Sequence, residues 1–174
     1  MYALILDSSA FIQGLDPQNE AAYTVPLVVG ELRDGFITTR LRSMESTGRL
    51  KVVEPEDSYL GVVEDESLRM GESHALSATD KQVLALGLQL RDTMLEPVIV
   101  SDDYSVQNMA EALGLRHRGL ATPGIKRQFT WTLYCPGCRR EYAGPQPDGV
   151  CPICGTELKR RPSRKRGVTR RGGI

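Results

Sequence analysis

Four cysteines near the C-terminus divide this chain into two parts that must fold in different ways. They form two Cys-x2-Cys pairs, Cys135/Cys138 and Cys151/Cys154, separated by twelve residues, and the chain has no other cysteine. Two such pairs can surround one tetrahedral ion with sulfur ligands at ~2.3 Å. About 30 residues cannot bury enough surface to fold alone, so we expect zinc to stabilise this segment. Four thiolates leave no open coordination position, so the expected zinc is structural.

The same cysteines could instead form two disulfides or hold an iron–sulfur cluster. The spacing favours zinc, and nothing in the sequence marks secretion. The N-terminal stretch "MYALILDSSAF" has no basic leader and reaches Asp7 after five apolar residues. Neither a signal peptide nor a membrane anchor is therefore expected, and we expect a cytoplasmic protein with no membrane partner.

Three aromatic residues, Trp131, Tyr134 and Tyr142, lie close to the cysteines in the sequence, as do Arg139 and Arg140. In so small a domain the aromatic side chains could form the sparse hydrophobic core. They could equally form a surface on which RNA bases stack. The sequence leaves both alternatives open.

The charges are distributed unevenly along the chain. Residues 1–125 hold 10 basic and 19 acidic residues, whereas residues 126–174 hold 12 basic and 3 acidic ones. A basic segment beside an acidic body indicates a polyanionic partner, usually a nucleic acid, although a merely solubilising tail is the alternative. The candidate RNA-binding residues are Lys126, Arg127, Arg139, Arg140, Lys159, Arg160 and Arg161.

Apolar runs alternate with helical patterns through the first part of the chain. Residues 2–6 and 96–101 are typical of strands buried on both faces, and residues 51–55 and 116–120 are expected to be shorter strands. Helices are predicted from Ser8 or Ser9, from Pro26, and over residues 37–48, 56–70, 77–94 and 103–114. This alternation predicts an α/β fold with a mainly parallel sheet.

Acidic residues stand where ligands bind in such a sheet. Asp7 follows the first strand, and Asp102 and Asp103 follow the strand at 96–101, so these side chains are expected to be neighbours at the carboxyl ends of the strands. Glu31 has apolar neighbours on both sides, so we expect it to be half-buried, and Asp80 lies in the first turn of the helix at 77–94. Each also has a simpler explanation as a helix cap or a solvated residue.

If these carboxylates converge, they form an oxygen-rich pocket of the kind that Mg²⁺ or Mn²⁺ prefers. One or two such ions could hold a scissile phosphate and activate water for its hydrolysis. The histidines, His74 and His117, are isolated in the sequence and are expected to be ordinary surface or helix-end residues.

The first part of the chain resembles the PIN-domain nucleases. The resemblance rests on "DSSAF" at Asp7, Pro26-x4-Glu31-Leu32, Leu76-Ser77-x2-Asp80, and Val100-Ser101-Asp102-Asp103, and it spans residues 2 to about 117. In that family four acidic positions bind divalent ions, which implies Asp7, Glu31, Asp80 and Asp103 as ligands and catalytic residues. Ser101 stands where threonine is usual, and Asp102 occupies the variable place and could also contribute.

The added four-cysteine segment makes the chain similar to the Nin-one-binding family, in its compact archaeal form. That resemblance implies a PIN-like three-layer domain over residues 1–118 and a zinc ribbon over 129–160. The Gly/Pro-containing stretch at 119–128 is expected to be a linker, and the basic segment at 161–174, which has almost no apolar residues, is expected to be disordered. It implies an endoribonuclease that cleaves single-stranded precursor RNA at the 3′ end of small-subunit rRNA, within a pre-ribosomal particle. The alternatives are a non-catalytic RNA-binding assembly factor and a toxin-like nuclease that cuts tRNA.

Overall fold

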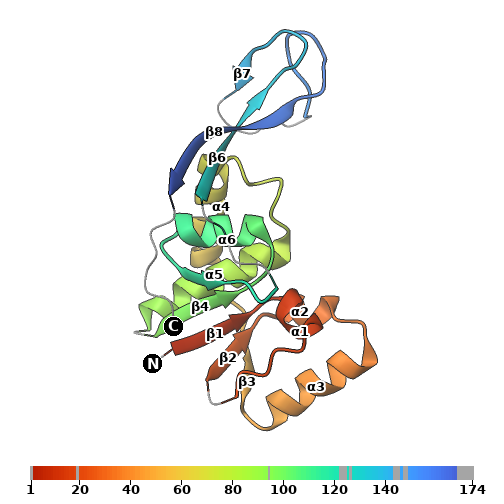
Figure 1. The fold of residues 1–174 in the computed structure, drawn as a ribbon, viewed down its shortest axis with the longest axis vertical. Helices are drawn as coiled ribbons and strands as arrows, with labels where there is room; N and C mark the ends of the chain where they lie inside the picture. The colour runs from red at the N-terminus through yellow and green to blue at the C-terminus, as the bar shows by residue number, and fades with distance from the viewer. Residues whose placement is uncertain are drawn as a thin grey trace.

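The computed structural model describes residues 2–18, 20–93, 95–121, 125, 127–142, 146 and 149–167, of which 127 and 164–167 are described by their backbone alone. Its strands form two separate sheets, and helices surround the larger one (Figure 1). In chain order they are β1 Tyr2–Leu6, α1 Ser8–Ile12, β2 Ala21–Thr24, α2 Pro26–Glu31, α3 Gly35–Ser46, β3 Leu50–Val52, α4 Asp57–Met70, α5 Ala78–Asp92, β4 Glu96–Val100, α6 Tyr104–Ala112, β5 Arg116–Arg118, β6 Arg127–Tyr134, β7 Glu141–Tyr142 and β8 Lys159–Gly167.

The larger sheet is parallel throughout, in the order β3-β2-β1-β4-β5. β1 and β4 lie at its centre and pair from Tyr2 with Glu96 to Leu6 with Val100. The last four residues of both strands are buried, which agrees with their continuous apolar sequences. The register therefore ends the two strands side by side, and Asp7 and Ser101 follow them at the same edge.

The helices cover this sheet and supply most of its hydrophobic core. α5 packs against β1 and β4, α6 against β5, and α3 against β3 (Figure 1). α5 begins with a capping box, in which Ser77 and Asp80 each accept a hydrogen bond from the other's backbone amide. Its buried apolar residues run from Val83 to Leu90. The parallel sheet and the helices that cover it confirm the expected α/β fold with a mainly parallel sheet.

The structure differs from the sequence-based expectation in several short elements. β2 was not predicted, because four residues before a proline carry too little pattern to distinguish a strand from a loop. α3 begins at Gly35 rather than at residue 37, since the Asp34 side chain accepts hydrogen bonds from the amides of Phe36 and Ile37. β3 ends at Val52 instead of continuing to residue 55.

The smaller sheet is antiparallel, in the order β7-β6-β8, and it carries the cysteines. The disordered tail expected from residue 161 is corrected for residues 161–167, which extend β8 along β6. Strand pairing uses backbone groups, so a highly basic sequence can still form a strand at a sheet edge. Pro162, which cannot donate a backbone hydrogen bond, lies at the irregularity opposite Thr130 and Trp131. Residues 168–174 lie outside the described part of the chain.

None of the helices within the described residues combines the length and the apolar character that crossing a bilayer requires.

Candidate functional site

Asp7 and Ser101 meet at the carboxyl edge of the sheet. Ser101 Oγ donates a hydrogen bond to Asp7 Oδ2 at 2.6 Å, and the amide of Asp7 donates to the carbonyl of Val100. Asp7 also caps α1, because its Oδ1 accepts from the Ser8 amide at 2.7 Å. Asp7 as a whole residue is 7% exposed. Burial raises its pKa, partly offset by the hydrogen bonds from Ser101, Ser8 and Ser9, and the charge of Asp103 raises it further.

Asp103 is held beside Asp7 by the same serine. Its backbone amide donates to Ser101 Oγ at 3.1 Å, and its side chain caps α6 by accepting from the Ser105 amide. Ser101 Oγ therefore connects two acidic residues through a donated and an accepted hydrogen bond. The sequence placed these acids at the same sheet edge, and the structure brings them together there.

Asp80 reaches this edge from the first turn of α5. Burial raises its pKa, hydrogen bonds from Ser77 lower it, and the charges of Asp7 and Asp103 raise it again. The electrostatic effect of these two residues on Asp80 means that the three acids lie close enough to repel one another. The capping role suggested by the sequence is real, but it does not separate Asp80 from the other carboxylates.

Glu31, at the end of α2, connects three helices around the acids. Its Oε2 accepts from Ser8 Oγ at 2.6 Å, and its Oε1 accepts from Thr79 Oγ1. Ser8 follows Asp7, and Thr79 precedes Asp80, so Glu31 is anchored to the neighbours of both aspartates. The expectation that Glu31 is half-buried is wrong: its side chain is exposed, because α2 ends there and only Val28 and Leu32 among the nearby apolar residues are buried.

Asp102 makes a different set of contacts from Asp103. Its side chain accepts hydrogen bonds from the amides of Leu120 and Ala121 and from Gln13 Nε2. These contacts tie the strand end to the segment that follows β5. Two adjacent aspartates thus point to different partners, a distinction that the sequence could not make.

Oxygen ligands in this arrangement suit a hard divalent cation such as Mg²⁺ or Mn²⁺. Two of the aspartates have pKa values raised in part by the charge of neighbouring acids, which a bound cation would relieve. The oxygens are more widely spaced than the thiols described next. Within the described part of the chain, the cysteines form the one group of three or more possible ligands whose atoms all lie within 4.8 Å of one another. Mg²⁺ retains several waters, so ligands from two or three carboxylates would suffice.

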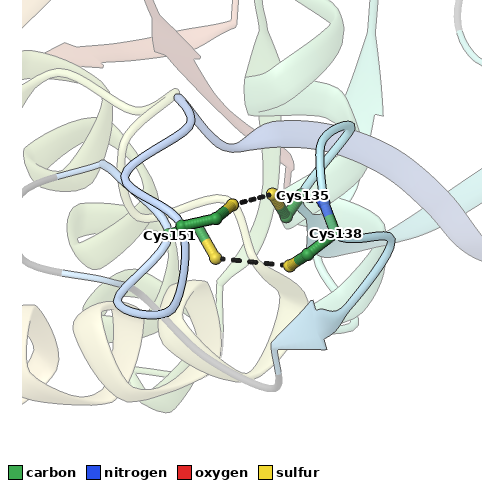
Figure 2. Close-up of side chains that lie close together, drawn as sticks. Cys135, Cys138 and Cys151 are labelled. Atoms are coloured by element: carbon green, nitrogen blue, oxygen red, sulfur yellow. Dashed lines mark hydrogen bonds between the residues drawn. The ribbon is translucent and has the colours of Figure 1, made fainter.

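The four cysteine sulfurs converge between two knuckles of the small sheet (Figure 2). The Sγ atoms of Cys135 and Cys154 lie 3.4 Å apart, and those of Cys138 and Cys151 lie 3.6 Å apart. Both distances are far longer than a disulfide bond of ~2.05 Å. They are close to the ~3.8 Å edge of a tetrahedron with 2.3 Å metal–sulfur bonds. The cysteines can therefore bind one tetrahedral metal ion.

The two knuckles have the same backbone design. The amide of Arg139 donates to the carbonyl of Cys135, and the amide of Gly155 donates to that of Cys151, each at 2.8 Å. Gly155 has φ +69°, and Arg139, at the equivalent position, has φ +63°. This left-handed conformation strains arginine, whereas glycine adopts it without a steric penalty.

Of the three aromatic residues, the structure places Tyr142 in the small hydrophobic core. Tyr142 packs on the cysteine cluster, and its hydroxyl lies 2.9 Å from Cys151 Sγ, a contact that raises the pKa of Tyr142 to about 12. Tyr142 therefore belongs to the small core. Tyr134 and Trp131 are half-buried on the small sheet, with the guanidinium groups of Arg161 and Arg160 over their respective rings.

Glu72, which follows α4, links α6 to the small sheet and was not predicted. It is 2% exposed, and its Oε1 accepts from Trp131 Nε1 at 2.6 Å and from Asn108 Nδ2 at 3.0 Å. Arg160 forms an ion pair with its other oxygen. Gly71, which precedes it, could not be replaced easily, since a Cβ there would lie 2.5 Å from the carbonyl oxygen of Trp131. The sequence offers no local signal for such a junction, because its members come from four separate elements.

The predicted RNA-binding residues have different environments. Arg139, Arg140 and Lys159 are exposed. Arg160 and Arg161 are engaged in ion pairs with Glu72 and Glu141, respectively. Lys126 and the side chain of Arg127 lie outside the described residues.

The parallel sheet, with acidic side chains where its strands end, defines a protein of the PIN class. A family model described as "PIN domain of ribonuclease" matches residues 4–90.

Relatives that align with nearly the whole chain identify one family within this class. The chain is 44% identical to "Endoribonuclease Nob1" of Pyrococcus abyssi over 163 residues, which cover 94% of this chain and 96% of that one. It is 37% identical to "Endoribonuclease Nob1" of Methanothermobacter thermautotrophicus, over 90% and 91% of the two chains. It is also 35% identical to "Ribonuclease VapC1" of Thermoplasma acidophilum, over 96% and 82%. The chain belongs to the Nob1 endoribonuclease family.

Proposed function

We propose that this protein is a metal-dependent endoribonuclease that cleaves single-stranded precursor rRNA at the 3′ end of the small-subunit rRNA, within a pre-ribosomal particle. Its relatives named Nob1 are endoribonucleases, and residues 4–90 match the PIN domain of ribonuclease. The observation that carries the proposal is the contact of Ser101 with both Asp7 and Asp103, which holds two acids at one sheet edge near Asp80.

Asp7, Glu31, Asp80 and Asp103 are proposed to hold Mg²⁺ or Mn²⁺ at this edge. The ion would activate water and stabilise the leaving oxygen during phosphodiester hydrolysis. Ser101 keeps Asp7 and Asp103 in place, and Ser8 and Thr79 orient Glu31. The local negative charge repels RNA, so the exposed cations of the small sheet are proposed to supply the attraction. Cys135, Cys138, Cys151 and Cys154 are proposed to hold a structural zinc ion.

Cleavage of a single-stranded precursor-rRNA oligonucleotide in Mn²⁺ tests this proposal. The comparison uses the wild-type chain, Asp80→Asn, and Asp65→Asn as a control at an exposed site. We expect cleavage by the wild type and the control, and a loss of about 100-fold or more for Asp80→Asn. Equal cleavage by all three would refute the site. Binding of the oligonucleotide without cleavage by any of them would support the alternative of a non-catalytic RNA-binding assembly factor.

The match with "Ribonuclease VapC1" favours a second candidate, a toxin-like nuclease that cuts tRNA. Parallel cleavage of precursor rRNA and tRNA by the wild-type chain distinguishes the two. Faster cleavage of tRNA would favour the second candidate.

A further inference from the structure

A pocket of about 360 Å³ lies between the end of α4 and the small sheet. Its walls are mainly apolar and come from Leu68 on α4, Trp131 and Leu133 on β6, and Tyr142 on β7. This volume is within the range of small-ligand sites, which commonly form where two domains meet. Neither the acids at the sheet edge nor the cysteine cluster lines it, so the proposed cleavage and zinc sites do not account for it.

Two arginines that line the pocket each form an ion pair with a carboxylate that is less exposed than the arginine. Arg69 donates through Nε and Nη2 to Glu66, and its side chain is 71% exposed, whereas that of Glu66 is 16% exposed. Among the described residues, Glu66 is the one ion-pair partner of Arg69, so the remaining Nη1 donors are available. The guanidinium is therefore oriented by a shielded acid and presents unused donors to an anion.

Arg160 repeats this arrangement on the opposite wall. Its Nη1 lies 3.4 Å from Glu72 Oε2, and its side chain is 33% exposed, whereas Glu72 is 2% exposed. Its guanidinium also lies 4.8 Å from the centre of the Trp131 ring. Guanidinium groups fixed in this way bind phosphate well, because their planar donors are already oriented.

We propose that this pocket binds one unpaired nucleotide of an RNA strand, with the base against the apolar wall and a phosphate between Arg69 and Arg160. The inference rests on the proposed function, since it makes the pocket between α4 and the small sheet a substrate subsite that is distinct from the acidic edge. Walls that include the rings of Trp131 and Tyr142 suit a nucleobase, and bases that stack on aromatic or guanidinium planes are typical of single-strand recognition. A duplex keeps its bases stacked and paired, so the subsite selects unpaired RNA.

Trp131 is the only tryptophan of the chain, so its fluorescence reports directly on this pocket. The experiment titrates the zinc-loaded, full-length protein, without Mg²⁺ or Mn²⁺, with a single-stranded RNA oligonucleotide. The comparison ligands are an abasic strand of the same length, and AMP and UMP as free nucleotides. We expect saturable quenching by the RNA, at least about tenfold weaker binding of the abasic strand, and weaker binding of the free nucleotides.

Two variants test whether the signal comes from the pocket. Ser73→Phe fills the pocket from its lining, and Ser43→Phe, at an exposed position of α3, is the matched control. Arg69→Gln removes one guanidinium without adding bulk, with Arg42→Gln as its exposed control. We expect each pocket variant to weaken RNA binding about tenfold and each control to bind as the wild type does. Zinc content and circular dichroism establish that the variants are folded.

The outcomes separate this inference from the proposed function. The subsite would be overturned if metal-dependent cleavage occurred with no change in Trp131 fluorescence, or if quenching were undiminished in both pocket variants. Either result would leave the proposed nuclease function unaffected. Equal quenching by the abasic strand would overturn the subsite in favour of general polyanion binding. Tighter binding of the free nucleotides than of the oligonucleotide would overturn the proposal that the ligand is an RNA strand. Base-dependent quenching that both pocket variants weaken, in a protein that cleaves nothing, would support the subsite and refute the nuclease.

Discussion

The Ser101 hydroxyl donates a 2.6 Å hydrogen bond to Asp7 although the two residues lie 94 positions apart in the sequence. The contact exists because β1 and β4 are adjacent and parallel, and end in register. The same oxygen accepts a hydrogen bond from the amide of Asp103. A single buried serine thus contacts the carboxylate of one acid and the backbone amide of the other.

Replacing Ser101 should lower both the stability of the protein and its rate of cleavage. Ser101→Ala removes the buried donor of Asp7 Oδ2 and leaves it the longer, 3.4 Å hydrogen bond from Ser9 Oγ, so we expect the free energy of unfolding to fall by ~1–3 kcal/mol. Cleavage should fall by ~10- to 100-fold, because Asp7 and Asp103 lose their shared contact. Ser101→Thr keeps the hydroxyl and is the control for both urea denaturation and cleavage. Full activity in the alanine variant would contradict this positioning role.

The two adjacent aspartates should respond differently to the same substitution. Asp103→Asn preserves the cap of α6, because asparagine caps helices as well as aspartate does, but we expect it to abolish cleavage. Asp102→Asn weakens the charged hydrogen bonds to residues 120 and 121, so we expect ~1–2 kcal/mol lower stability with cleavage retained. Cleavage rates and thermal unfolding of both variants check this. The reverse pattern would assign the catalytic role to Asp102.

The acidic edge should make stability fall as the pH rises. Burial raises the pKa values of Asp7 and Asp80 above 3.8, their value in the unfolded chain. The folded state then binds protons more tightly, so these groups contribute stability below pH ~4 that is lost as the pH rises through their folded pKa values. Asp80→Asn should show a smaller loss than the wild type. Urea denaturation between pH 4 and 7, without Mg²⁺ or Mn²⁺ and with Asp65→Asn as the control, measures the difference.

Metal removal should act mainly on the small sheet. Cys151→Ser removes a buried thiol of the proposed zinc site, so we expect zinc stoichiometry to fall from one per chain and the β6–β8 pairing to be lost. Trp131 emission should shift to longer wavelength as the indole loses Glu72 and becomes hydrated. Atomic absorption and fluorescence measure both quantities. Retention of zinc and of the wild-type emission would refute the four-thiolate site.

Arg139 should show opposed effects on stability and on RNA binding. Its φ of +63° is strained for arginine, so Arg139→Gly should stabilise the zinc-loaded protein by ~1 kcal/mol. The lost charge should weaken binding of single-stranded RNA and reduce the slope of log K against log salt by about 0.7. Arg140→Gly, at an exposed residue whose φ is not positive, is the control for the gain in stability. An unchanged slope would remove Arg139 from the RNA-binding surface.

Much of this molecule follows from patterns within short stretches of sequence. The apolar runs of β1 and β4, the capping box of Ser77 and Asp80, and the spacing of the four cysteines all depend on residues within one turn, strand or knuckle. β2 and the extension of β8 were missed, because a short or basic strand is stabilised by the neighbour with which it pairs.

The sequence by itself determined that acids follow two buried strands and that four thiols come in two matched pairs, since strand burial and knuckle spacing are local properties. The tertiary structure alone decided that Ser101 joins Asp7 to Asp103 while Asp102 turns towards residues 120 and 121. It also decided that Glu72 is buried against Trp131 and Arg160. These contacts depend on strand order and on the packing of distant elements, which bring together groups that no local pattern relates.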